Sequence, residues 1–181
     1  MSLVVFLASG CATTTRFTAA DTAAVDRLLG FIGERLEVAP AVARIKWNTK
    51  APIEDRLRER QIIDDVARRT NEYGLNSAIA ASFLRGQIEA SKTVQNALHA
   101  EWTASTQPAF TEVADLDRDL RPVLDRLTAM MLRALADTLP VIQQHGGRNL
   151  LDGRYKTTLA RSPGGETAVR QAVAPLQRLS R

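Results

Sequence analysis

The sequence has few residues that would break the chain, cross-link it or bind a metal. Its 181 residues include ten glycines, seven prolines and one cysteine, Cys11, so no intramolecular disulfide can form. The two histidines, His99 and His145, are far apart, and neither has an acid or a cysteine at metal-ligand spacing. No glycine-rich phosphate loop and no Ser-His-Asp set is found. We therefore expect no metal and no organic cofactor, and both histidines are interpreted as surface residues.

Alanine, leucine and arginine dominate what is present, and β-branched or aromatic runs are few. This composition predicts an all-α fold, and the length suits one domain with a real core. The formal net charge is +4. Most of the excess lies in residues 148–181, which hold seven Lys or Arg against two Asp or Glu. These charges are spaced out and not clustered, which favours a solvated helical face over nucleic-acid binding.

The N-terminus resembles an export signal. An apolar segment from Leu3 to Ala8 leads into Ser9-Gly10-Cys11, as at the end of a secretory signal. Ala8-Ser9-Gly10-Cys11 also resembles a bacterial lipobox, which predicts a lipid anchor at Cys11. The apolar run is far too short for a transmembrane helix. We expect residues 1–20 to be a signal-peptide remnant or a disordered N-terminus, and the protein to be periplasmic or secreted.

Apolar residues recur at helical spacing over most of the remaining chain, residues 21–181. Asp21 is a candidate N-cap for the first helix, which Pro40 should kink or briefly break. Asp119 is a candidate cap for the fourth, with Pro122 in its first turn. Leu57 and Val66 are expected to face inward on the second. Gly74 is expected to follow its end, and Asn76 to cap the third. The expected helices span about 21–47, 54–73, 76–102, 119–139, 150–161 and 166–179.

Several polar residues share helix faces in this pattern. Arg35 and Lys46 are 11 residues apart, close to three helical turns, and face one side if the helix continues through the proline. Asp55, Arg58 and Glu59 stand at i, i+3 and i+4 on the second expected helix. Each of these residues alone would be explained as a solvated or ion-paired surface side chain.

Three further polar residues complete the set. Ser91 and Gln95 form an i, i+4 pair on the third expected helix, and Arg121 lies at the start of the fourth. Spacing alone would leave a helical domain of unknown function, because each position is compatible with ordinary helix surface.

Residues 25–102 resemble the all-helical chorismate mutases. A later segment resembles the extra C-terminal part of the exported subclass, in which an arginine from the added helices completes the pocket. This resemblance implies a helical bundle with core mutase helices at 21–104 and C-terminal helices at 112–181 that complete the site. The matching segments are Glu34-Arg35-Leu36, Ile45-Lys46-Trp47, Pro52 to Glu59, Gln87 to Ser91 with Gln95, and Leu120 to Asp125.

The resemblance also implies an activity, the rearrangement of chorismate to prephenate. This unimolecular pericyclic reaction needs positioning and electrostatic stabilisation, but no nucleophile. Lys46, Gln95 and Arg58 are the implied catalytic residues, with Lys46 and Gln95 donating to the ether oxygen. The implied substrate-binding residues are Arg35, Arg58, Arg121 and Ser91 for the carboxylates, and Glu59 with Asp55 for the ring hydroxyl.

The chain departs from the family pattern at two positions. Ile62 replaces the glutamine that some members carry one turn after the arginine matching Arg58, and Gln95 replaces a glutamate found in others. The neutral amide predicts a flat pH–rate profile near neutrality. The Arg121 match implies that each chain completes its own site. We also expect the protein to form a homodimer. The alternative function is a non-enzymatic exported helical bundle, a lipid-anchored adaptor or binding module.

Overall fold

The computed structural model describes residues 16–180, and their secondary structure is entirely helical, so the predicted all-α fold is confirmed. The predictions for residues 1–15, the lipid anchor at Cys11 included, lie outside this range. None of the helices described is both long and apolar enough to cross a membrane. The elements are α1 (Ala19–Thr49), α2 (Arg56–Arg69), η1 (Thr70–Tyr73), α3 (Ser77–Ala104), η2 (Leu116–Leu120), α4 (Arg121–Ile142), α5 (Gly147–Thr158) and α6 (Gly165–Leu179).

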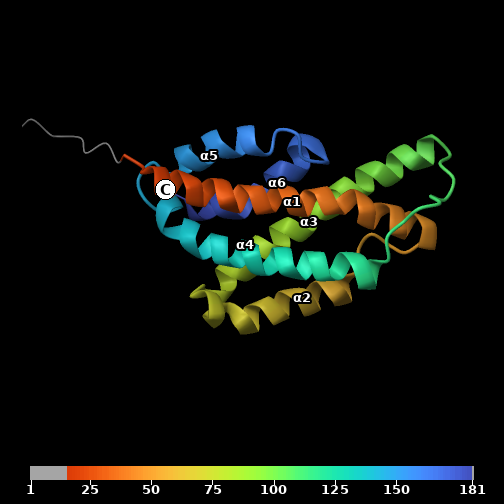
Figure 1. Ribbon diagram of the computed structural model, residues 1–181, viewed down its shortest axis with the longest axis horizontal. Helices are drawn as coiled ribbons and strands as arrows, with labels where there is room; N and C mark the ends of the chain where they lie inside the picture. Colours follow the sequence, from red (N-terminus) through yellow and green to blue (C-terminus); the bar gives the residue numbers. More distant parts are fainter. Residues whose placement is uncertain (1–15, 181) are drawn as a thin grey trace, which may run out of the picture.

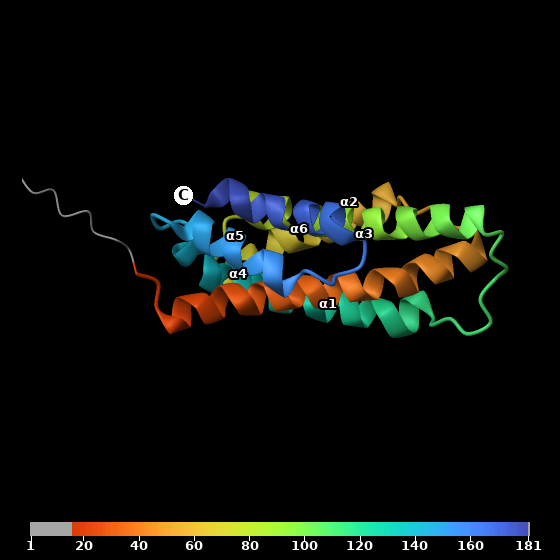
Figure 2. The ribbon, with the colours of Figure 1, turned by 90° about the horizontal axis from the view of Figure 1, so that it is seen from above.

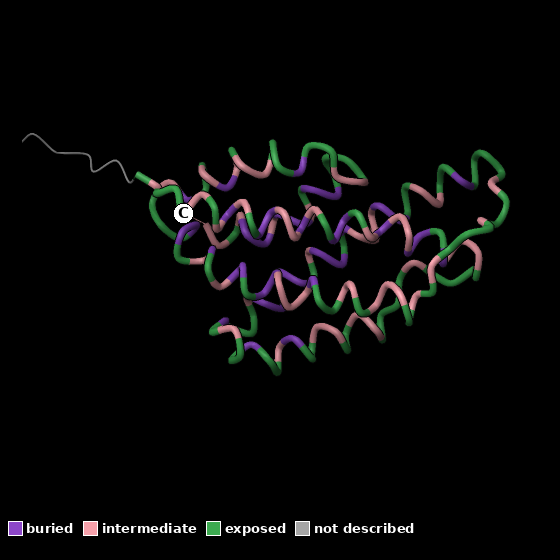
Figure 3. Tube along the Cα trace, in the orientation of Figure 1, coloured by how far each residue is buried: buried purple, intermediate pink, exposed green. Residues whose placement is uncertain are grey.

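Two long helices form the centre of an elongated bundle (Figures 1 and 2). Helix α1 packs against α3, α4 and α5, whereas α3 also packs against α2 and α6. Buried positions follow the sides of the helices that face one another (Figure 3). Leu28 and Ile32 of α1, Phe83 of α3, Leu135 of α4 and Leu176 of α6 are all at most 1% exposed. These side chains belong to one apolar core that spans the early and late parts of the chain.

Helix α1 is longer and more continuous than its sequence suggests. It begins with a capping box in which the Thr18 hydroxyl accepts from the Asp21 amide and the Asp21 carboxylate accepts from the Thr18 amide. Thr18 is therefore the N-cap, and the prediction of Asp21 was wrong by three residues. Pro40 lies inside the helix, which continues to Thr49, so of the predicted kink or break the break is absent. Ala39 and Ala43 are buried on either side of it, so packing holds the helix together where the proline removes a hydrogen bond.

Helix α2 lies on the outer side of α3 and begins two residues later than predicted. Asp55 is its N-cap and accepts from the backbone N–H of Arg58 at 3.0 Å. Val66 is buried as predicted, but Leu57 is 61% exposed, so its expected inward orientation was wrong. Gly74 ends the following 3-10 turn with φ of 65°, a conformation that glycine adopts without strain. Asn76 then caps α3, as the sequence predicts.

The segment that leads into α4 also differs in detail. A single π-helical turn, η2, precedes α4, and its cap is Asp115, whose carboxylate accepts from the Arg118 amide at 2.7 Å. Asp119, the predicted cap, instead accepts from the Asp115 amide. Pro122 does lie in the first turn of α4. The effect of η2 is to start α4 at Arg121, beside the C-terminal half of α1 (Figure 1).

An aromatic cluster joins the C-terminal ends of α1 and α3 to the loop between α3 and η2. Trp102 lies 5.6 Å from Trp47 and 4.8 Å from Phe110, measured between ring centroids. Asn48 donates to Phe110 O at 2.8 Å and accepts from Phe110 N at 2.9 Å. His99 packs on Trp47 and lies 2.9 Å from Ala43 O through Nε2. Its interpretation as a surface residue was therefore wrong, and the cluster fixes the path of the loop towards α4.

Candidate active site

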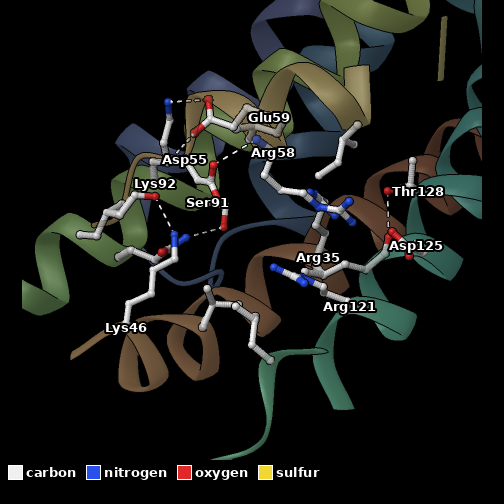
Figure 4. A pocket seen from close by; sticks show the side chains of 17 residues that line it. Arg35, Lys46, Asp55, Arg58, Glu59, Ser91, Lys92, Arg121, Asp125 and Thr128 are labelled. Atoms are coloured by element: carbon white, nitrogen blue, oxygen red, sulfur yellow. Dashed lines mark hydrogen bonds and ion pairs between the residues drawn. The ribbon is translucent and has the colours of Figure 1, made fainter. Parts of the chain in front are cut away.

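A pocket between α1, α2, α3 and the start of α4 brings together all of the polar residues singled out in the sequence (Figure 4). Its lining includes residues that lie up to 93 positions apart in the chain, from Arg35 to Thr128. The predicted residues found there are Arg35, Lys46, Asp55, Arg58, Glu59, Ser91, Gln95 and Arg121. One chain therefore contributes every predicted member of the site.

Arg35 is the most deeply buried charge of the pocket, at 7% exposed. Its Nε and Nη1 atoms have no hydrogen-bond partner among the described residues. Burial lowers the pKa of Arg35 to about 10, and the charge of Asp125 opposes this effect. A buried guanidinium with unsatisfied donors is costly to keep in a fold. Such a group is suited to an anionic ligand, whose oxygens would accept from both nitrogens.

Lys46 projects from α1 three turns beyond Arg35, as the continuous helix allows. Its Nζ donates to Ile53 O at 2.6 Å. Burial lowers the pKa of Lys46, and the negative charges of Asp55 and Glu59 oppose the shift. The ammonium has three N–H donors, so the bond to Ile53 leaves two for a ligand.

The first turn of α2 contributes one cation and two anions. Glu59 is fixed through both oxygens, since Oε1 accepts from the Asp55 amide at 3.3 Å and Oε2 lies 3.2 Å from Lys92 Nζ. The guanidinium of Arg58 makes no hydrogen bond or ion pair with any side chain in residues 16–180. Its position in the pocket therefore leaves its planar fork of donors available for a carboxylate.

Helix α3 contributes Ser91 and Gln95, one turn apart. Gln95 is 4% exposed, and its Nε2 donates to Ser91 Oγ at 3.1 Å. The Oε1 atom has no partner among the described residues. Because an amide nitrogen carries two hydrogens, a second N–H of Gln95 remains for a ligand. The pair therefore presents a neutral donor that does not titrate.

Arg121, the first residue of α4, comes from the added part of the chain. It is paired with Asp117 one turn earlier, and its side chain is 39% exposed. Arg121 thus lies at the more open side of the pocket, whereas Arg35 lies at its buried side. The two cations could contact different carboxylates of one ligand.

Sequence reasoning missed three polar residues of the pocket, Lys92, Asp125 and Thr128. Helical spacing could have found two of them. Asp125 stands four residues after Arg121, and Lys92 stands three before Gln95, so each shares a face with a predicted residue.

Within residues 16–180, no group of three or more His, Cys, Asp or Glu side chains is arranged to hold a metal ion.

The pocket carries five basic and three acidic residues in an all-helical bundle. Fold and pocket together define a helical protein with a site for a small anionic ligand. Comparison with known proteins identifies the family more closely. Residues 21–96 match the family described as chorismate mutase type II.

Solved structures extend this match over most of the chain. A chorismate mutase from Burkholderia phymatum is 30% identical with a TM-score of 0.78, over 87% of this chain and 98% of that one. A chorismate mutase from Burkholderia thailandensis is 33% identical with a TM-score of 0.77, over 85% of this chain and 99% of that one. The chain therefore belongs to the chorismate mutase family.

A curated relative covers a shorter stretch. The protein named secreted chorismate mutase from Yersinia pestis is 31% identical over 108 residues, which are 60% of this chain and 57% of the relative. The chain thus matches little more than half the length of that relative.

Proposed function

We propose that this chain rearranges chorismate to prephenate. The observation that carries the proposal is the convergence of eight polar residues, selected from the sequence, on one pocket of net positive charge. Chorismate is a dianion with an ether bridge and a ring hydroxyl. Five cations, of which Arg35 is buried with unsatisfied donors, suit such a ligand better than they suit the surface of an adaptor protein.

The reaction is unimolecular, so the pocket acts by selecting a conformation and stabilising charge. Arg35 and Arg58 hold one carboxylate through charge-assisted bonds, and Arg121 contacts the other, with Ser91 adding a hydroxyl donor. Holding both carboxylates selects the compact chair-like form in which the reacting ends meet. Conformer selection is thus the first contribution of the pocket.

Lys46 and Gln95 make the second contribution. As the C–O bond of the ether breaks, negative charge builds on the oxygen. Both residues are held before the substrate arrives, Lys46 by Ile53 O and Gln95 by Ser91. Donors fixed in a site with little water stabilise developing charge without reorganising. Glu59 and the neighbouring Asp55 accept from the ring hydroxyl and set the orientation of the ring.

The direct test is the loss of chorismate's ultraviolet absorbance on adding the protein, measured with and without a chelator. We expect turnover that the chelator does not affect. The Arg58→Ala variant should lose nearly all turnover and keep its helical circular dichroism. Arg60→Ala is the matched control, because Arg60 is an exposed arginine of the same helix that does not line the pocket. Full activity in Arg58→Ala would refute the site.

We also propose that the protein is exported. The N-terminal apolar run ending at Cys11 and the name of the Yersinia pestis relative support this. The apolar segment before Cys11 then acts as the signal, and Cys11 is the candidate for lipid attachment, whereas Thr18 to Ala20 belong to the capped start of α1. Expression of the full chain and of Cys11→Ala in a bacterium, followed by fractionation and mass spectrometry of the mature N-terminus, tests both points. A full-length chain retained in the cytoplasm would contradict export.

The remaining organisation follows the same reasoning. We propose one domain over residues 21–181, in which 112–181 completes the site, and a homodimer with a complete site in each copy. The contribution of Arg121 from α4 supports completion within one chain. Light scattering during size-exclusion chromatography measures the oligomeric state, and a monomeric mass would rule out the dimer.

A further inference from the structure

Lys92 is a pocket residue without an assigned role. It lies on α3, and its side chain is only 14% exposed. Three carboxylates surround its ammonium: Nζ lies 2.7 Å from Glu89 Oε1, 3.2 Å from Glu59 Oε2 and 3.9 Å from Glu54 Oε1. Figure 4 draws Lys92 with Glu59, the one of the three that lines the pocket. Glu54 and Glu89 are half exposed, whereas Glu59 is 21% exposed and lines the pocket. Lys92 therefore links two outer carboxylates to one inner carboxylate.

Glu59 has competing partners within the pocket. Lys46 is close enough for the charges of Glu59 and Lys92 to influence its pKa, and Arg58 is the adjacent residue of α2. A carboxylate free to rotate would be attracted to either cation and would occupy the donors needed by an anionic substrate. In the structure Glu59 instead accepts from Lys92 and from the Asp55 amide.

We propose that Lys92 is a positioning residue that holds the Glu59 carboxylate away from Lys46 and Arg58 and towards the ring hydroxyl of the substrate. This inference rests on the proposed chorismate mutase activity. Lys92 need not touch the substrate, because it acts through Glu59. Glu54 and Glu89 hold the ammonium from the solvent side, so its position does not depend on Glu59 alone.

A purely structural role for Lys92 would be a link between α2 and α3. The two roles differ in what the loss of Lys92 does when Glu59 is already changed. If Lys92 acts through Glu59, the effects of the two substitutions on kcat/KM should not be additive. If Lys92 only stabilises the fold, its removal should lower the unfolding temperature and leave kcat/KM of the folded fraction unchanged.

The test is a double-mutant cycle of Lys92→Met and Glu59→Gln, read as kcat and KM for chorismate, with thermal unfolding measured on each variant. We expect Lys92→Met to lower kcat/KM by about 100-fold, the effect of a misplaced polar group. In the Glu59→Gln background the same change should cost less than about threefold. Lys92→Arg should restore most of the activity, since it keeps the charge and the reach.

Lys156→Met is the matched control, because Lys156 is an exposed lysine of α5 outside the pocket. The inference would be overturned if the fold-decrease in kcat/KM of the double variant equalled the product of the decreases in the two single variants. It would also be overturned if Lys92→Met kept the wild-type kcat/KM. If Lys92→Met does not fold, Lys92→Gln takes its place in the cycle with the same two expectations. An inactive wild-type protein would instead refute the proposed function, so the two failures are distinguishable.

Discussion

Replacing the buried amide of Gln95 with a carboxyl group turns a donor that works at every pH into one that works only when protonated. Gln95 is 4% exposed and hydrogen-bonds to Ser91, so Gln95→Glu places its carboxyl group in the same confined position. Burial disfavours the charged form and raises the pKa of such a group. The protonated acid can donate to the ether oxygen, which is the role proposed for the amide, whereas the carboxylate cannot.

The size of the effect follows from the loss of one preorganised donor, which costs roughly 10²–10³ in rate. The sign is set by the proton: activity is retained below the pKa of the introduced group and lost as the pH rises through it. Above that pKa the protonated fraction falls tenfold per pH unit, so the rate should level off about two to three units higher. The wild-type profile should be flat near neutrality.

The assay is kcat for chorismate loss across the pH range in which circular dichroism shows both proteins folded. Gln95→Met is the matched control, because it fills similar space without a donor and should be slow at every pH. A Gln95→Glu profile that follows the wild type would remove Gln95 from the ether contact. A profile that follows Gln95→Met at low pH would show that no protonated acid can replace the amide.

Three further predictions address the pKa of Lys46, the origin of the site within one chain and the packing of α6. Wild-type kcat/KM should decrease at an alkaline pH below the usual lysine range, because burial lowers the pKa of Lys46. Lys46→Arg should move this decrease to higher pH. A decrease at the same pH in Lys46→Arg would assign the titration to another group. Mixing inactive Arg35→Ala and Arg121→Ala chains should restore no activity, whereas recovery would show that sites are shared between copies. Gly86→Ala should lower the free energy of unfolding in urea by about 1–3 kcal/mol, because its Cβ would lie 2.6 Å from Pro175 Cγ. Gly30→Ala, with nothing within 4 Å, should not destabilise the protein.

The sequence predicts best where local chemistry decides the structure. Gly74 ends a helical segment and Asn76 starts the next, since a left-handed backbone and a capping side chain are local requirements. At the first helix both Thr18 and Asp21 are good caps, and the capping box uses both, so residue type alone could not choose between them. The continuity of α1 through Pro40 depends on neighbours from distant segments, which no local pattern contains.

The site was predicted through positions shared with a family, and what was missed is particular to this chain. In the sequence Lys92 looks like an ordinary helix-surface lysine, and only the folded chain places Glu54, just before α2, and Glu59 of α2 beside it. Asp125 is relevant only because α4 lies against α1, close enough to oppose the shift in the pKa of Arg35. Contacts of this kind arise from tertiary packing, so helical spacing can suggest a shared face but not the partner.

The connection from α3 to α4 within one chain determines how activity depends on protein concentration. Arg121 reaches the pocket through a covalent connection, which Asn48 and the aromatic cluster hold in place. A residue delivered by a second subunit is lost when dilution separates the subunits, whereas a tethered residue keeps a constant effective concentration. Turnover per chain should therefore be unchanged on dilution, as long as the single chain stays folded. With the export proposed above, that property preserves activity where copies of the protein are scarce.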